Sequence, residues 1–165
     1  MTDNVLRGGC HCGALEIEMH TELATGRLPV RACQCSFCRH HGAVSTADPA
    51  GSVIFRVREP EQLNTYRFAL KLADYLVCRR CGVYVGAFMP DEGDGAGAGS
   101  RAGAGSRAGL AVVSVNSLAA RVQFAAPQAM DYDGETAQGR VQRRRERWMP
   151  ARIETAPARA TGGGA

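Results

Sequence analysis

The sequence lacks the features that would mark a membrane or secreted protein. Aromatic residues make up only 6% of its 165 residues, and Trp148 is the single tryptophan. No apolar run approaches the roughly 20 residues that a membrane-spanning helix needs, and Met1–Gly9 is polar, without the apolar stretch of a secretory signal. We therefore expect a cytoplasmic protein without a membrane partner, whose clustered cysteines act as metal ligands or redox thiols rather than as disulfides.

Positive charge is only in slight excess, with a formal net charge of +4. Much of it comes from one C-terminal cluster, which consists of Arg143, Arg144, Arg145 and Arg147. A domain that binds nucleic acid usually carries a stronger basic stripe. We interpret the cluster as a solvated charged segment and do not expect nucleic acid as a partner.

Short β-prone segments separated by turn signals fill most of the chain. In Ala14–His20, apolar Leu15, Ile17 and Met19 alternate with polar residues, which is the period of a half-buried strand. Other expected strands are 29–33, 42–47, 52–57, 63–68, 74–78, 83–88 and 110–116. This pattern predicts one mainly β domain over residues 1–150. The charged segment Thr136–Trp148 is compatible with a short helix, anchored by Trp148.

Two stretches are predicted to lie outside the packed domain. Residues 93–109 contain the sequence AGAGSR twice in succession, over 96–101 and 102–107, and no apolar side chain larger than alanine, so we expect a flexible Gly/Ala/Ser/Arg insertion. Residues 151–165 end in three glycines and an alanine, and we expect them to form a disordered tail.

All seven cysteines fall into groups with the spacing of metal ligands. Cys78-Arg-Arg-Cys81-Gly is typical of a metal-binding turn, in which the glycine adopts a positive φ. Cys10-His-Cys12-Gly is a shorter version of it. Together these two pairs supply the four ligands of a closed, tetrahedral structural zinc site.

The remaining group is Cys33-Gln-Cys35-Ser-Phe-Cys38. Three thiolates on one zinc leave a fourth position free, as in catalytic sites, and favour binding of an incoming thiol over formation of hydroxide. A histidine could instead close this site, and the candidates are His40, His41 and His11. The protein would then be a structural module with two zinc ions.

The three cysteine groups resemble one known family. The segments 9–14 (GCHCGA), 33–39 (CQCSFCR) and 78–83 (CRRCGV) are similar to those of the glutathione-dependent formaldehyde-activating enzymes, a family that also contains centromere protein V. The likeness extends from about Leu6 to Asp131. The insertion at 93–109 departs from the family pattern, as does Gln34, where a histidine is more usual.

The resemblance implies a fold, two metal sites and an activity. The fold would be a β-tent of the Mss-four-like type, built of small twisted antiparallel sheets held by zinc. Two zinc ions would be bound per chain, a structural ion by Cys10, Cys12, Cys78 and Cys81 and a catalytic ion by Cys33, Cys35 and Cys38. The activity would be that of a carbon–sulfur lyase of the S-(hydroxymethyl)glutathione synthase type, with a thiol and a small aldehyde as substrates. The alternative is a non-catalytic, zinc-stabilised binding module.

Overall fold

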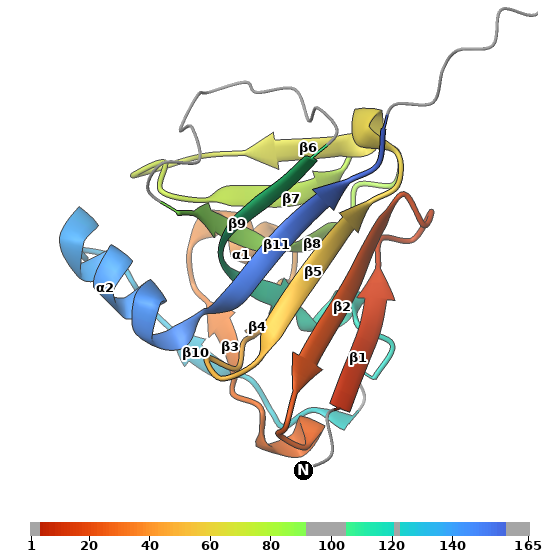
Figure 1. The fold of residues 1–165 in the computed structure, drawn as a ribbon. Coiled ribbons are helices and arrows are strands. Elements are labelled where there is room, and N and C mark those ends of the chain that lie inside the picture. The colour runs from red at the N-terminus through yellow and green to blue at the C-terminus, as the bar shows by residue number, and fades with distance from the viewer. Residues whose placement is uncertain (1–3, 92–104, 121–122, 158–165) are drawn as a thin grey trace, which may run out of the picture.

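The computed structural model describes residues 4–91, 105–120 and 123–157 and is dominated by strands (Figure 1). The strands are β1 (Asn4–Gly9), β2 (Leu15–Thr21), β3 (Val30–Cys33), β4 (Ser45–Thr46), β5 (Ser52–Val57), β6 (Leu63–Tyr66), β7 (Asp74–Cys78), β8 (Tyr84–Pro90), β9 (Gly105–Ser114), β10 (Gln128–Met130) and β11 (Met149–Thr155). The α-helices are α1 (Ser36–His40) and α2 (Ala137–Arg147), and short 3-10 turns occupy Thr25–Arg27, Pro60–Gln62 and Val115–Ser117. The predicted mainly β class and the C-terminal helix are confirmed.

The eleven strands form one twisted sheet that branches at β9. One path runs β1-β2-β5-β11-β9 and continues through β4, β3 and β10, while β8, β7 and β6 extend from β9 as a second arm. The long strand β9 joins the arms because successive parts of it pair with β11, β8 and β4. The sheet is mixed rather than antiparallel throughout, since β5–β11 and β3–β10 are parallel pairs.

Alternating side chains of the central strands build the core. In β2 the predicted alternation is confirmed, with Leu15, Ile17 and Met19 buried and the residues between them half-buried. These side chains pack in one cluster with Phe55 of β5 and Phe88 of β8, among others. Each large apolar side chain buried in this way contributes roughly 1.5–3 kcal/mol, and the cluster draws such side chains from both arms of the sheet.

The predicted loop at 93–109 is wrong at its C-terminal end. Residues 105–109 are the first half of β9 and pair with β11, while residues 93–104 lie outside the described part of the chain. The small side chains fit a crowded strand position: a Cβ on Gly109 would lie 2.2 Å from the Met89 carbonyl oxygen. Backbone pairing and close packing therefore stabilise a segment that has little side-chain hydrophobicity of its own.

The predicted tail is wrong over residues 151–155. These residues belong to β11, which lies between β5 and β9 and buries Met149, Ala151 and Ile153 on one face (Figure 1). Apolar residues at every second position, the period of a strand, explain this burial. Residues 158–165 lie outside the described chain.

Two other features bear on the sequence predictions. Trp148 is buried and joins the main core, which confirms its predicted anchoring of the C-terminal segment.

Strand β1 occupies much of the N-terminal stretch and pairs with β2 along its whole length, although its composition predicts no element there. No helix in the described ranges is long and apolar enough to span a membrane.

Candidate metal centres

The first cysteine group joins the turn after β1 to the β7–β8 hairpin. The sulfur atoms of Cys10, Cys12, Cys78 and Cys81 all lie within 4.8 Å of one another. The Cys10 and Cys12 sulfurs are 3.7 Å apart, and those of Cys12 and Cys78 are 3.5 Å apart. The predicted four-ligand set is therefore brought together, and four clustered sulfurs are a donor set that suits zinc.

Both turns have the backbone conformation that the sequence predicts. Gly13 and Gly82 have φ angles of 80° and 73°, in the left-handed region that favours glycine. Each glycine N–H donates to the carbonyl of the first cysteine of its turn, Gly13 to Cys10 at 3.2 Å and Gly82 to Cys78 at 2.9 Å. The Leu15 N–H also donates to the Cys10 sulfur at 3.2 Å. Such hydrogen bonds to sulfur favour the thiolate form that a metal requires.

The two arginines between Cys78 and Cys81 donate hydrogen bonds to neighbouring oxygen atoms. The Arg80 guanidinium donates to both carboxylate oxygens of Glu59, at 3.0 and 2.5 Å, and Arg79 donates to the Leu63 carbonyl.

Burial raises the pKa of the Cys78 thiol to about 12. A bound cation would remove this penalty by stabilising the thiolate directly, so the burial of this group fits a metal site.

The second cysteine group lies where β3 runs into the short helix α1. The sulfur atoms of Cys33, Cys35 and Cys38 lie within 4.8 Å of one another. Cys35 is the N-cap of α1, and its sulfur accepts a hydrogen bond from the Cys38 N–H at 3.5 Å. The local turn that begins the helix therefore also places the second and third sulfurs beside the first.

The Cys33 thiol in this group has a lowered pKa. A hydrogen bond from the Cys38 side chain lowers the pKa of Cys33 to about 6. The same hydrogen bond, together with burial, raises the pKa of Cys38. The three sulfurs thus share protons unequally, and three thiolates together would need a cation to be stable in this half-buried position. The residues fit a zinc ion.

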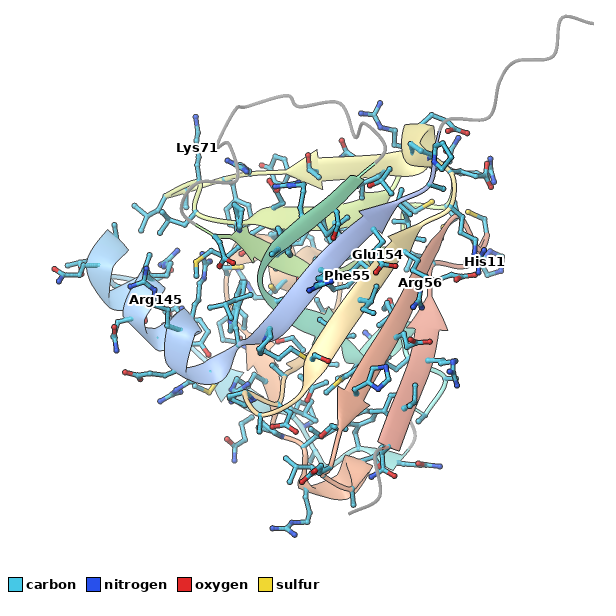
Figure 2. All side chains as sticks on the ribbon, in the orientation of Figure 1. His11, Phe55, Arg56, Lys71, Arg145 and Glu154 are labelled. Atoms are coloured by element: carbon cyan, nitrogen blue, oxygen red, sulfur yellow. The ribbon has the colours of Figure 1, made fainter. Side chains whose placement is uncertain are left out.

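No histidine completes the second group among the residues that the structure describes. The group contains three cysteines alone. The His41 ring instead packs against Phe37, with ring centroids 4.4 Å apart, and lies near Tyr84. His40 and His11 are exposed on the surface, and Figure 2 shows His11 at the far end of the β1–β2 strand pair from α2. None of these three histidine candidates is grouped with the three sulfurs among the described residues.

The second group opens into a cavity of about 420 Å³. Cys33, Cys35 and Cys38 form part of its wall, whereas the first group does not border it. The other lining residues are mainly aromatic and basic, namely Arg31, Arg39, Phe68, Tyr75, Tyr84, Tyr132, Arg140, Arg143, Arg144, Arg147 and Trp148. Burial raises the pKa of Tyr75 to about 12 and that of Tyr84 well above its usual value, so both hydroxyls remain protonated hydrogen-bond donors.

Helix α2 supplies much of the basic wall. Arg140, Arg143, Arg144 and Arg147 recur at the spacing of one helical face and all line the cavity. Arg140 and Arg143 are ion-paired with Glu135, at 3.3 and 2.6 Å, and Arg144 is only 5% exposed. The interpretation of this cluster as a solvated segment is therefore wrong for its inner face.

Sequence reasoning located both cysteine groups but missed the rest of the cavity wall. The signal for α2 was present, because positions i, i+3, i+4 and i+7 of one helix are all arginine. A one-sided arginine stripe on a helix tied down by Trp148 indicates a basic face turned towards the protein. The contributions of Tyr75 and Tyr84 had no comparable signal, since each depends on how the second arm of the sheet folds over α1.

Comparison with known proteins adds little to this geometry. No family model matches the chain. A Rhodobacter sphaeroides protein, solved as a Northeast Structural Genomics target, is similar at 26% sequence identity with a TM-score of 0.45, over 80% of this chain and 92% of that chain.

Proposed function

We propose that the chain is a zinc-dependent carbon–sulfur lyase of the glutathione-dependent formaldehyde-activating family, and that it binds two zinc ions. Its substrates would be a glutathione-type thiol and formaldehyde or another small aldehyde. One observation carries the proposal: Cys33, Cys35 and Cys38 gather on the wall of a 420 Å³ cavity, apart from the four-cysteine group. A ligand set beside a cavity is accessible to a small molecule, as a catalytic site requires.

Cys10, Cys12, Cys78 and Cys81 would hold the structural ion, and Cys33, Cys35 and Cys38 the catalytic one. Zinc in the second group would supply a position for the substrate sulfur and stabilise it as thiolate. The reaction needs no oxidant or reductant. A sulfur–carbon bond forms at the aldehyde carbon, the carbonyl electron pair moves to the oxygen, and the proton lost by the thiol ends on that oxygen.

The tyrosines of the cavity suit the oxygen side of this reaction. Tyr84 is buried and packs in one cluster with Cys38, and its raised pKa keeps the hydroxyl protonated. A protonated hydroxyl can donate a hydrogen bond to an oxygen as negative charge develops on it. Phe37 meets Tyr84 edge-on, with ring centroids 5.3 Å apart, and helps to fix the tyrosine ring. We therefore assign Tyr84 the role of orienting and stabilising the developing alkoxide.

The test must separate catalysis from the spontaneous addition of thiols to aldehydes. Exchange NMR on mixtures of glutathione and formaldehyde measures the adduct-forming rate with and without the purified protein. The wild type and an Arg152→Gln control, changed at an exposed position of β11, should both accelerate exchange. Cys38→Ser should lose the acceleration, and Tyr84→Phe should reduce it by about 10²-fold.

A panel of small thiols and aldehydes extends the test to other substrates. Equal rates for wild type and Cys38→Ser on every pair would sink the proposal. That outcome would favour the alternative, a non-catalytic binding module stabilised by zinc.

A further inference from the structure

Arg144 is a buried cation that forms no ion pair with a carboxylate among the described residues. It is 5% exposed, lines the cavity, and its Nε has no hydrogen-bond partner within the described structure. Its guanidinium lies over the Trp148 ring, 4.6 Å from the centroid, and its Nη1 is 3.9 Å from the Met89 sulfur. These neighbours satisfy few of the five N–H donors of a guanidinium, and Arg144 lines the cavity.

Three other partly buried arginines of the described chain are paired with carboxylates. Arg67 and Arg107 both contact the buried carboxylate of Asp74, and Arg143 makes two hydrogen bonds to Glu135. This pattern follows the rule that a charge taken out of water needs a counter-charge or hydrogen bonds. Arg144 departs from it within the described residues.

Arg31 provides a second cation in the same wall. It is half-buried on β3, two residues before Cys33, and no carboxylate pairs with it in the described structure. These two cations line the cavity together with four other arginines and a single carboxylate residue, Asp133. This charge balance favours an anionic occupant.

We propose that Arg144, assisted by Arg31, is an anion-binding subsite that takes the oxyanion of a small molecule, a carboxylate or a phosphate, and selects anionic over neutral ligands. Guanidinium groups bind both oxyanions in a bidentate manner. That the same molecule carries the thiol reacting at the Cys33 group rests on the proposed function. A competing account is that Arg144 only offsets the negative charge of the cysteine sulfurs.

The test uses probes without a thiol, so that it does not depend on catalysis. Succinate, inorganic phosphate and neutral succinamide are titrated into the full-length protein, and melting temperature and NMR shifts report binding. At least one anion should bind the wild type saturably, and succinamide should not; the anion that binds identifies carboxylate or phosphate as the ligand group. Arg144→Met should weaken that binding at least 10-fold, while Arg145→Met, the neighbouring exposed arginine (Figure 2), should not.

The outcomes separate this subsite from the proposed activity. Replacing a buried charge by methionine is often tolerated, and Arg31→Met gives a second, more exposed variant with the same expected loss if Arg144→Met does not fold. Cys38→Ser should retain anion binding even where it loses activity. Absence of anion binding by the wild type, equal binding by Arg144→Met, or binding lost in Cys38→Ser but kept in Arg144→Met would each overturn the proposal.

Discussion

The sulfur atoms of Cys12 and Cys78 lie 3.5 Å apart although the two residues are 66 positions apart in the chain. The contact joins the turn after β1 to the end of β7, that is, one arm of the branched sheet to the other. A metal that bridges such distant segments closes a long loop of the unfolded chain, and for that reason it stabilises the folded state. A metal ion bound by the first cysteine group would therefore link the two arms of the sheet.

Removal of one ligand from the first cysteine group should destabilise the whole domain. Cys78 is 1% exposed, so Cys78→Ser would both lose a ligand and leave a buried hydroxyl. We expect a loss of about 3 kcal/mol or more, which for a chain of this size lowers the melting temperature by roughly 10 °C. Circular dichroism melts together with zinc analysis measure both effects.

Cys35→Ser is the matched control for Cys78→Ser. It changes a ligand of the second group, beside the cavity, and should lose metal with a much smaller change in melting temperature. Equal melting temperatures for wild type and Cys78→Ser would show that the first group does not stabilise the fold.

The strand assignment of residues 105–109 predicts a contrast between two glycines. A Cβ at Gly109 would lie 2.2 Å from the Met89 carbonyl oxygen and 2.9 Å from the Phe88 ring, whereas one at Gly105 meets no atom within 4 Å. Gly109→Ala should cost about 1–3 kcal/mol through overpacking, and Gly105→Ala should change stability by less than about 0.5 kcal/mol. Urea denaturation of the two variants tests this, and similar midpoints would argue against β9 beginning before Leu110.

The cysteine groups were predictable from sequence, but the strands at 105–109 and 151–155 were not. Close spacing in CHCG, CQCSFC and CRRCG reports local turns, and local turns fix which sulfurs can share a metal. Gly105–Gly109 and Ala151–Thr155 owe their conformation to pairing with each other, a contact between segments with weak local signals. Such tertiary pairing overrides composition, so the first segment was predicted as a loop and the second as a tail.

Acid should weaken the fold partly through Glu18. Hydrogen bonds from Arg56 and then from His20 lower the pKa of Glu18 from its ordinary 4.5 to about 2. A carboxylate whose folded-state pKa is depressed contributes stability above its ordinary pKa, and this contribution is lost as the pH falls through the folded value. We expect Glu18→Gln to remove the part of the stability loss that occurs between about pH 4.5 and pH 2.

Denaturation midpoints measured across this pH range for the two proteins isolate the effect. Both proteins keep the same cysteines, so any release of metal by acid affects them alike. Parallel curves for wild type and Glu18→Gln would contradict the assigned role of Glu18.

The spacing of the arginines in α2, together with the tryptophan that follows them, indicates which side of the helix is buried. The arginines of α2 look like a solvated cluster by composition, whereas their spacing places Arg140, Arg144 and Arg147 on one helical face. The neighbouring Trp148 is buried and fixes that face against the cavity. Arg140 and Arg143 form ion pairs with Glu135, which lies in the loop before the helix. These pairs depend on the conformation of that loop and could not be predicted from the sequence.

Metal content combined with zinc X-ray absorption tests the central claim most directly, because it counts the ions and identifies their ligands. The wild type should bind two zinc ions per chain, all with sulfur ligands, and an added thiol should raise the mean number of sulfur ligands per zinc. Cys35→Ser should keep only the ion of the four-cysteine group, and its spectrum should no longer respond to the thiol. One zinc ion per wild-type chain, or a wild-type spectrum with a histidine ligand and no response to thiol, would contradict the account.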